Sequence, residues 1–162
     1  MKAIAALMLG ASLAVSSLGA QAGVADMVDV EQAYVRAVPP GQPNSAAFMQ
    51  LSNRDAEAHG VVDASSPAAG VVELHTHIHE GGMMMMRRIQ RIDLAAQAKT
   101  VLQPGGLHIM LINLQQPLVP GEKVALTLVF EDGSEKQIEA PVQTVMQEMQ
   151  PQGAPMSHDM SH

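Results

Sequence analysis

The chain has 162 residues with a formal net charge of −7 and contains no cysteine, but it has 13 methionines and 7 histidines. An acidic chain without a basic patch interleaved with aromatic residues is not expected to bind nucleic acid. Without cysteine the chain has neither disulfides nor thiolate ligands, so its soft donors are thioethers, which do not form disulfides in an oxidising compartment.

The first 22 residues have the features of a secretory signal peptide. Lys2 supplies one positive charge, a mostly apolar run follows to Val15, and an Ala-x-Ala ending stands at Ala22. The apolar run is too short to span a bilayer comfortably, and no cysteine follows it to carry a lipid. We therefore expect cleavage rather than a retained anchor. The predicted organisation is a signal peptide at 1–22, one domain at 23–145 and a tail at 146–162.

The predicted domain is a series of short alternating segments separated by Gly, Pro and Asn turns. We predict strands over residues 28–38, 46–51, 61–64, 71–79, 83–92, 107–114, 124–130 and 136–142, with a short extended piece at 100–102. Residues 93–98 are predicted as a loop, with one helical turn as the alternative. Many short strands without a convincing long helix predict an all-β sandwich or barrel.

Two of these strands place histidine or methionine on the face opposite their aliphatic side chains. On 71–79 one face carries aliphatic residues and Thr76, and the other carries His75, His77 and His79. On 107–114 one face carries Leu107, Ile109 and Leu111, and the other carries His108 and Met110. Because the aliphatic faces can enter a core, imidazole and thioether donors are left on the other side. This arrangement indicates a metal site.

The donor types favour copper over other metals. Thioether sulfur is a soft neutral donor that suits Cu(I), imidazole serves Cu(I), Cu(II) or zinc, and hard ions need a carboxylate cage that this stretch lacks. Residues i and i+2 of one strand lie roughly 6.5–7 Å apart, so that His108 and Met110 can converge on one ion. His75 is the natural partner on another strand, and the methionine run at 83–86 can supply the fourth donor.

Plainer interpretations of the same residues stay open at this point. Three alternating histidines are also typical of a solvated face or of a zinc site, and methionines such as Met83 to Met85 are more often core packing than ligands. His59 has no partner nearby in the sequence, and we interpret it as a surface residue.

The sequence resembles the periplasmic copper chaperones called PCu(A)C. Their metal motif is His, ten residues, Met, twenty-one residues, then His-x-Met, and it fits His75, Met86, His108 and Met110 without a gap. The resemblance extends from about Val28 to Val142. It includes A-Y-V-R-A-V-P-P-G, A-A-F-M-Q-L-S-N, S-S-P-A-A and L-Q-P-G-G-L-H-I-M-L. His77 stands where many members carry methionine, and Tyr34 where members often have tryptophan.

The resemblance implies a cupredoxin-like (Greek-key) β-sandwich that binds Cu(I) through His75, Met86, His108 and Met110. His77, His79 and Met84 are candidates for additional ligands. It also implies a periplasmic chaperone, not inserted in the membrane after signal cleavage, that delivers copper to the CuA subunit of cytochrome c oxidase or to another periplasmic copper protein. The alternatives are a periplasmic copper scavenging or storage protein without a dedicated acceptor, and a copper redox enzyme. Absence of cysteine excludes a type-1 electron-transfer site and speaks against the enzyme.

The C-terminal segment is rich in His, Met, Pro and Gln, and we expect it to be a disordered tail because it has little apolar bulk to bury. Its candidate ligands are Met149, Met156, His158, Met160 and His162. We interpret the tail as a flexible second copper-capturing segment that accepts Cu(II) as well as Cu(I). A solvated end without function is the alternative.

Overall fold

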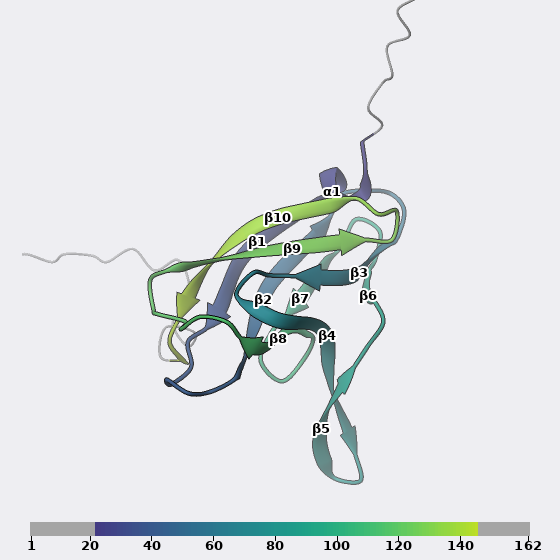
Figure 1. Ribbon diagram of the computed structural model, residues 1–162. Helices are drawn as coiled ribbons and strands as arrows, with labels where there is room; N and C mark the ends of the chain where they lie inside the picture. Colours follow the sequence, from purple (N-terminus) through teal and green to yellow (C-terminus); the bar gives the residue numbers. More distant parts are fainter. Residues whose placement is uncertain (1–21, 146–162) are drawn as a thin grey trace, which may run out of the picture.

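The computed structural model describes residues 22–145, which contain ten strands and one turn of helix joined by loops (Figure 1). The predicted signal peptide, apart from Ala22, and the predicted tail lie outside these residues. The elements are α1 Val24–Met27, β1 Val28–Arg36, β2 Asn44–Asn53, β3 His59–Ser65, β4 Ala69–Glu80, β5 Met83–Arg88, β6 Ile92–Leu94, β7 Lys99–Leu102, β8 His108–Leu114, β9 Lys123–Phe130 and β10 Glu135–Gln143.

The strands form a β-sandwich whose two layers are joined along one edge. One layer has the order β5-β4-β8-β2-β1, with β7 also paired to β2, and the other has the order β10-β9-β3-β6. All pairings are antiparallel except that of β1 with β10, which joins the two layers through the register Val35↔Val142. In Figure 1 strands β9 and β10 lie in front of β1. The predicted all-β sandwich is confirmed.

Alternation of buried and partly or fully exposed residues directs one face of strands such as β8 and β9 into the core. On β9, Val124, Leu126, Leu128 and Phe130 are buried, whereas the residues between them are not. On β8, Ile109 and Leu111 are buried on the core side. Fully burying one such side chain stabilises the fold by roughly 1.5–3 kcal/mol. On β8 this alternation sends Ile109 and Leu111 into the core and leaves His108 and Met110 on the opposite face.

Strands β4 and β5 form a hairpin that projects from the lower end of the sandwich in Figure 1. Gly81 and Gly82 make its two-residue turn with φ angles of 60° and 77°. Two successive positive φ angles define a type I′ turn, the form whose twist matches a hairpin, and glycine adopts them without strain. All six residues of β5 are exposed.

The prediction of one strand over 83–92 is wrong, because the chain changes layers within it. β5 ends at Arg88, and Ile92 belongs to β6, which pairs with β3 in the other layer. Ile92 and Leu94 are buried, so β6 also replaces the start of the loop predicted at 93–98. Every other predicted strand is present, with its ends moved by no more than two residues.

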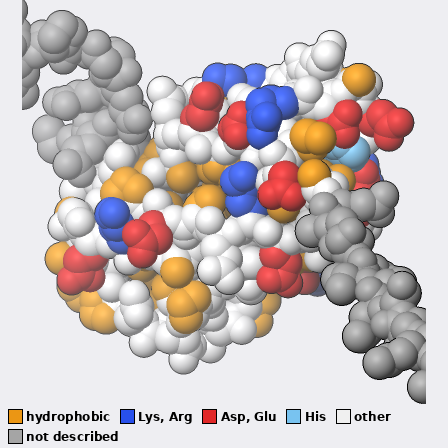
Figure 2. All heavy atoms as spheres, turned by 90° about the horizontal axis from the view of Figure 1, so that it is seen from above, with side chains coloured by type: hydrophobic (Ala, Val, Ile, Leu, Met, Phe, Trp, Pro, Cys, Tyr) orange, Lys and Arg blue, Asp and Glu red, His pale blue; other side chains and the backbone are white. Residues whose placement is uncertain are grey.

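The helical turn α1 was not predicted, because four residues are too few for a periodic pattern. Its first amides are held from the far end of the sequence: Asp132 Oδ2 accepts from the Val24 amide at 2.9 Å, and Ser134 Oγ accepts from the Ala25 amide at 2.9 Å. Within residues 22–145 no helix is long and apolar enough to cross a membrane. Figure 2 shows acidic and basic side chains intermixed on the face seen from above.

Candidate metal centre

An open pocket of about 410 Å³ lies at the base of the hairpin, on the outer side of the β4–β8–β2 layer. Its lining includes five side chains with soft or borderline donors, together with Arg36 and Phe48. The donors are His77, Met84, Met86, His108 and Met110.

Strand register brings these donors together from three strands. β4 pairs with β8 so that His75 lies opposite His108, and β4 pairs with β5 so that His77 lies opposite Met86. Three of the four predicted ligands, Met86, His108 and Met110, line the pocket. His75 does not line it, but the ring centroids of His75 and His108 lie 5.6 Å apart. The ring centroids of His77 and His108 lie 5.2 Å apart.

His108 is buried although it lies on the outer face of its layer, with 2% of its surface exposed. Phe48, itself buried, packs near it with ring centroids 6.2 Å apart, and Tyr34 packs on Phe48 at 5.2 Å. Sequence reasoning did not identify Phe48 as part of the site. Alternation along β2 contains the signal, because Ala46 and Phe48 share the face that adjoins Met110 and His108.

The surroundings of His108 leave one ring nitrogen available. Its Nδ1 lies 3.1 Å from the Gly106 carbonyl oxygen, which can only accept, so Nδ1 carries the proton and Nε2 keeps its lone pair. Burial is the main cause that lowers the pKa of His108, and nearby His77, His75 and Arg36 lower it further. His108 therefore remains neutral, as a metal ligand must, to a lower pH than an ordinary histidine.

His75 is held in the complementary tautomer by a carboxylate. Its Nε2 lies 2.8 Å from Glu73 Oε2, and Arg88 Nη1 lies 3.3 Å from the other carboxylate oxygen. The hydrogen bond from His75, followed by the charge of Arg88, lowers the pKa of Glu73. A carboxylate that accepts from the far nitrogen of a histidine is the usual support of a metal-binding imidazole. Sequence reasoning missed Glu73 and Arg88.

The other nitrogen of His75, Nδ1, is buried and has no hydrogen-bond partner among the described residues. An unpaired buried polar atom costs roughly 1–3 kcal/mol unless something else satisfies it. A neutral imidazole with Nε2–H bound to Glu73 presents a lone pair at Nδ1. The atom therefore fits a metal ligand rather than a structural hydrogen bond.

Oxygen and nitrogen donors alone do not complete the site. Within residues 22–145 no three His, Cys, Asp or Glu side chains are grouped so as to hold a metal ion. A site at the pocket therefore needs thioether donors, and Met84, Met86 and Met110 line it. That donor set fits a soft ion better than zinc.

The interpretation of the methionine run as core packing is wrong. Met83, Met84, Met85 and Met86 are 65%, 53%, 42% and 47% exposed. They lie on β5, which projects beyond the sandwich and has no second layer to pack against. These four residues are therefore accessible from solvent.

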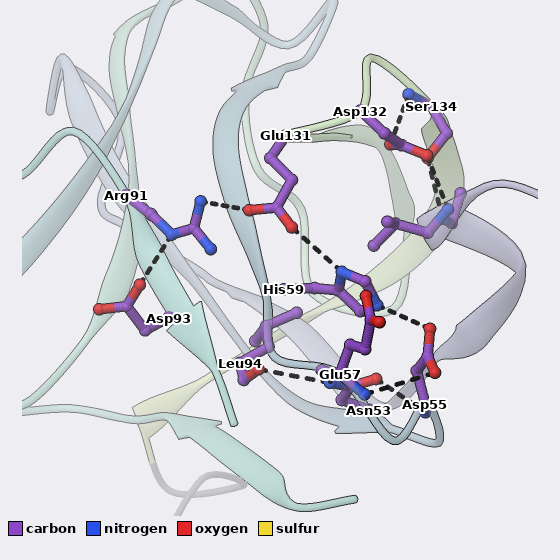
Figure 3. A network of polar contacts seen from close by, with 12 residues as sticks. Asn53, Asp55, Glu57, His59, Arg91, Asp93, Leu94, Glu131, Asp132 and Ser134 are labelled. Carbon is purple, nitrogen blue, oxygen red and sulfur yellow. Dashed lines mark hydrogen bonds and ion pairs between the residues drawn. The ribbon is translucent and has the colours of Figure 1, made fainter. Parts of the chain in front are cut away.

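The interpretation of His59 as a surface residue is also wrong, because His59 is buried between two carboxylates (Figure 3). Its Nε2 lies 2.9 Å from Asp55 Oδ2, and its Nδ1 lies 3.0 Å from Glu131 Oε1. Arg91 bridges Glu131 to Asp93, with its Nε 2.7 Å from Asp93 Oδ1. Glu131 is 72 residues from His59 in the sequence, so no local pattern indicated the contact.

This cluster stabilises a charged imidazole. Hydrogen bonds to Asp55 and then to Glu131 raise the pKa of His59, and the same contacts lower the pKa of both carboxyls. With both ring nitrogens engaged, His59 has no lone pair to offer a metal. The cluster holds β3 to the β9–β10 turn, which is a structural role.

The candidate ligands of the tail, Met149, Met156, His158, Met160 and His162, lie outside the described residues. The structure therefore does not place them relative to the pocket.

Comparison with known proteins identifies relatives over most of the chain. The model of the LpqE-like lipoprotein family matches residues 28–142. Lxx21020 of Leifsonia xyli subsp. xyli, whose name describes it as a lipoprotein, is 35% identical over 144 residues, which cover 86% of each chain. RP573 of Rickettsia prowazekii is 29% identical over 100 residues, which cover 61% of this chain and 55% of the relative.

Solved structures share the fold. The apo solution structure of DR1885 from Deinococcus radiodurans is 33% identical with a TM-score of 0.59, covering 89% of this chain and 96% of DR1885. Its Cu(I) form is 35% identical with a TM-score of 0.60, covering 80% and 85%. The copper-bound PCuAC domain of PmoF2 has a TM-score of 0.62 at 23% identity, covering 73% and 93%. The predicted cupredoxin-like β-sandwich is confirmed.

Proposed function

This chain belongs to the LpqE-like family, with the PCuAC fold that its sequence predicted, and from that premise we propose that it is an exported copper-binding protein that carries Cu(I). DR1885, which is 35% identical, has a solved Cu(I) form. The chain has no cysteine, the residue that carries a bacterial lipid anchor, although relatives are named as lipoproteins. Export in our proposal therefore depends on the signal peptide predicted at 1–22 and ends in the periplasm.

The proposed Cu(I) ligands are Nδ1 of His75, Nε2 of His108 and the sulfur atoms of Met86 and Met110. The observation that carries this assignment is the buried, unpaired Nδ1 of His75, whose Nε2 is engaged by Glu73. His108 supports it independently, because Gly106 engages Nδ1 and leaves Nε2 free. Two imidazoles and two thioethers form a neutral donor set, and soft thioethers select Cu(I) over harder ions.

The proposed role is transport and transfer rather than catalysis. Neutral ligands place no thiolate charge on the ion, so an acceptor can replace them one at a time. Met86 is 47% exposed on the hairpin, whereas His108 is buried. Exchange therefore begins at the thioether side of the site and ends at the imidazole side.

We propose the CuA subunit of cytochrome c oxidase, or another periplasmic copper protein, as the acceptor. The alternative is a periplasmic scavenging or storage protein that buffers copper without a dedicated acceptor. The exposure of Met86 on the hairpin favours transfer, because an acceptor can reach this proposed ligand directly. The tail from residue 146 is proposed as a second capture segment for Cu(I) and Cu(II), through Met149, Met156, His158, Met160 and His162.

Titration of the purified protein with Cu(I), followed by mixing with an apo CuA domain, tests this proposal. We expect one high-affinity Cu(I) whose X-ray absorption spectrum contains nitrogen and sulfur scatterers, and net transfer to the CuA domain. Absence of sulfur scattering would contradict the ligand set. Tight binding without transfer to the CuA domain would favour the storage alternative.

A further inference from the structure

The two faces of the β4–β5 hairpin differ in chemistry. Residues paired across an antiparallel hairpin lie on the same face, and successive pairs alternate between faces. One face carries the pairs His77↔Met86 and His79↔Met84. The other carries Ile78↔Met85 and Glu80↔Met83. Both faces have two methionines, but only one face pairs each methionine with an imidazole.

The two His/Met pairs follow one another along the hairpin toward the pocket, and we call His77↔Met86 the inner rung and His79↔Met84 the outer rung. Paired side chains have Cβ atoms about 4.5–5.5 Å apart, and rungs on one face are roughly 6.5–7 Å apart along the strands. Met84, Met86 and His77 line the pocket together with His108 and Met110. His79 lies one rung further out and does not line it.

The outer rung has no structural explanation. His79 is exposed, and within residues 22–145 no hydrogen bond or ion pair of its side chain is found. Met84 is 53% exposed, so neither side chain contributes to the core. On the opposite face, by contrast, Arg87 Nη2 lies 3.6 Å from Glu80 Oε2 and forms an ordinary surface ion pair.

We propose that His79 and Met84 form a separate entry site for Cu(I), from which the ion passes by way of His77 and Met86 to the pocket. This inference rests on the proposed function of the pocket as a Cu(I) site. Each step replaces one neutral donor by another on the same ion, so no electron is transferred and no covalent bond of the protein changes. With two protein donors the entry site binds weakly, and the pocket with four retains the ion.

The hairpin itself supplies a matched control. The variant H79V/M84L removes the outer rung, and the variant M83L/M85L removes two methionines from the opposite face of the same strand. Leucine conserves the volume of methionine, and none of these residues is buried, so both variants should fold. Circular dichroism of both variants verifies this.

Uptake is measured with the full chain by stopped flow, using the coloured Cu(I)–bicinchoninate complex as the donor. For H79V/M84L we expect uptake about tenfold slower than for the wild type, because the local concentration of donors near the pocket is lost. In H79V alone, which leaves every pocket-lining residue in place, the equilibrium affinity should stay unchanged. M83L/M85L should match the wild type in both the uptake rate and the equilibrium affinity. H79V alone should also slow uptake. His79 does not line the pocket, so slower uptake in this variant cannot come from a lost pocket residue.

A second measurement separates this inference from the proposed function. In an M86L/M110L background, titration with Ag(I), a redox-inert analogue of Cu(I), should shift the Met84 methyl resonance but not those of Met83 and Met85. Equal uptake rates in H79V/M84L and M83L/M85L, with tight binding intact, would overturn the entry site alone. If the wild-type protein does not bind Cu(I) tightly, the proposed function of the pocket is overturned.

Discussion

Within residues 22–145, the cluster around His59 and the candidate metal centre use the same imidazole ring in opposite ways. In the cluster around His59 both ring nitrogens lie within 3.0 Å of carboxylate oxygens, from Asp55 and Glu131. In the candidate metal centre His75 and His108 each have one engaged nitrogen and one left free. The first arrangement favours a charged imidazolium, and the second leaves each ring one nitrogen that no protein atom engages.

The difference teaches that burial of a histidine does not by itself separate a ligand from a structural residue. The deciding feature is how many ring nitrogens remain free, and the electrostatics agree. Carboxylates raise the pKa of His59, whereas burial among other imidazoles lowers the pKa of His108. Substitutions in the two environments should therefore affect different properties of the protein.

The largest expected effect is on copper affinity when both thioether ligands are replaced. The double variant M86L/M110L should weaken Cu(I) binding by more than about 100-fold, the upper end of the cost of losing a second-shell partner. Stability should change little, because leucine conserves volume and neither side chain is buried. Competition with a Cu(I) chelator measures the affinity. Unchanged affinity would remove both methionines from the ligand set.

A smaller loss of affinity should follow from removing the support of His75. The substitution Glu73→Gln should weaken Cu(I) binding by about 10–100-fold, because a neutral amide no longer fixes the tautomer of the ring. Asp55→Asn, the matched change in the His59 cluster, should leave Cu(I) affinity as it is. If both substitutions lower the affinity equally, the distinction between the two environments fails.

Replacement of His59, the structural histidine, should lower the stability of the fold without changing Cu(I) affinity. His59→Gln should lower the free energy of unfolding by about 2 kcal/mol, because hydrogen bonds to two charged partners are lost or weakened. Cu(I) affinity should not change. Urea denaturation measures the first quantity and chelator competition the second. A parallel loss of copper affinity would show that the cluster supports the metal centre.

The smallest effect is a pH dependence of opposite sign in the two environments. Since the pKa of His59 is raised, its contribution to stability is fully present below about pH 6.5 and is lost as the pH rises through its folded value. Asp55 and Glu131 have lowered pKa values, so their contributions are present above about pH 4.5 and are lost as the pH falls further. The cluster therefore stabilises the fold most between these values.

Copper binding should follow the other direction, because protons compete with the ion for imidazole nitrogens. Cu(I) affinity should fall on acidification, and since the pKa of His108 is lowered, the part of this loss that comes from His108 should appear only below about pH 6.5, the unperturbed value for histidine. Denaturation and chelator competition at several pH values measure the two trends side by side. Affinity that stays flat on acidification would contradict histidine ligation.

Local patterns and the family motif predicted most of the fold, and the five donors that line the pocket were all among the candidates. Alternation on β8 separated the core residue Ile109 from His108, and the spacing of the motif selected Met86 from four adjacent methionines. Such signals are carried by residues of one strand or by fixed distances along the chain. They need no knowledge of how the layers pack.

The features that the sequence did not predict depend on packing between distant segments. Glu131 reaches His59 only because β9 pairs with β3, and the Phe48 ring covers His108 only because β2 lies beside β8. The break between β5 and β6 similarly reflects the change of layer. No periodicity within residues 83–92 records that change.

The exposure of the hairpin methionines has a consequence for the chemistry of sulfur itself. Met83 to Met86 are 42–65% exposed, so a peroxide that reaches the hairpin meets the same thioethers that are open to a metal ion. Oxidation converts a thioether to a sulfoxide, which is polar and lacks the soft thioether sulfur that favours Cu(I). Because these side chains contribute nothing to the core, the damage would spare the fold. The hairpin thus links the oxidation state of its sulfur to the ability of the protein to handle copper, and methionine sulfoxide reductases are the enzymes that reverse such a change.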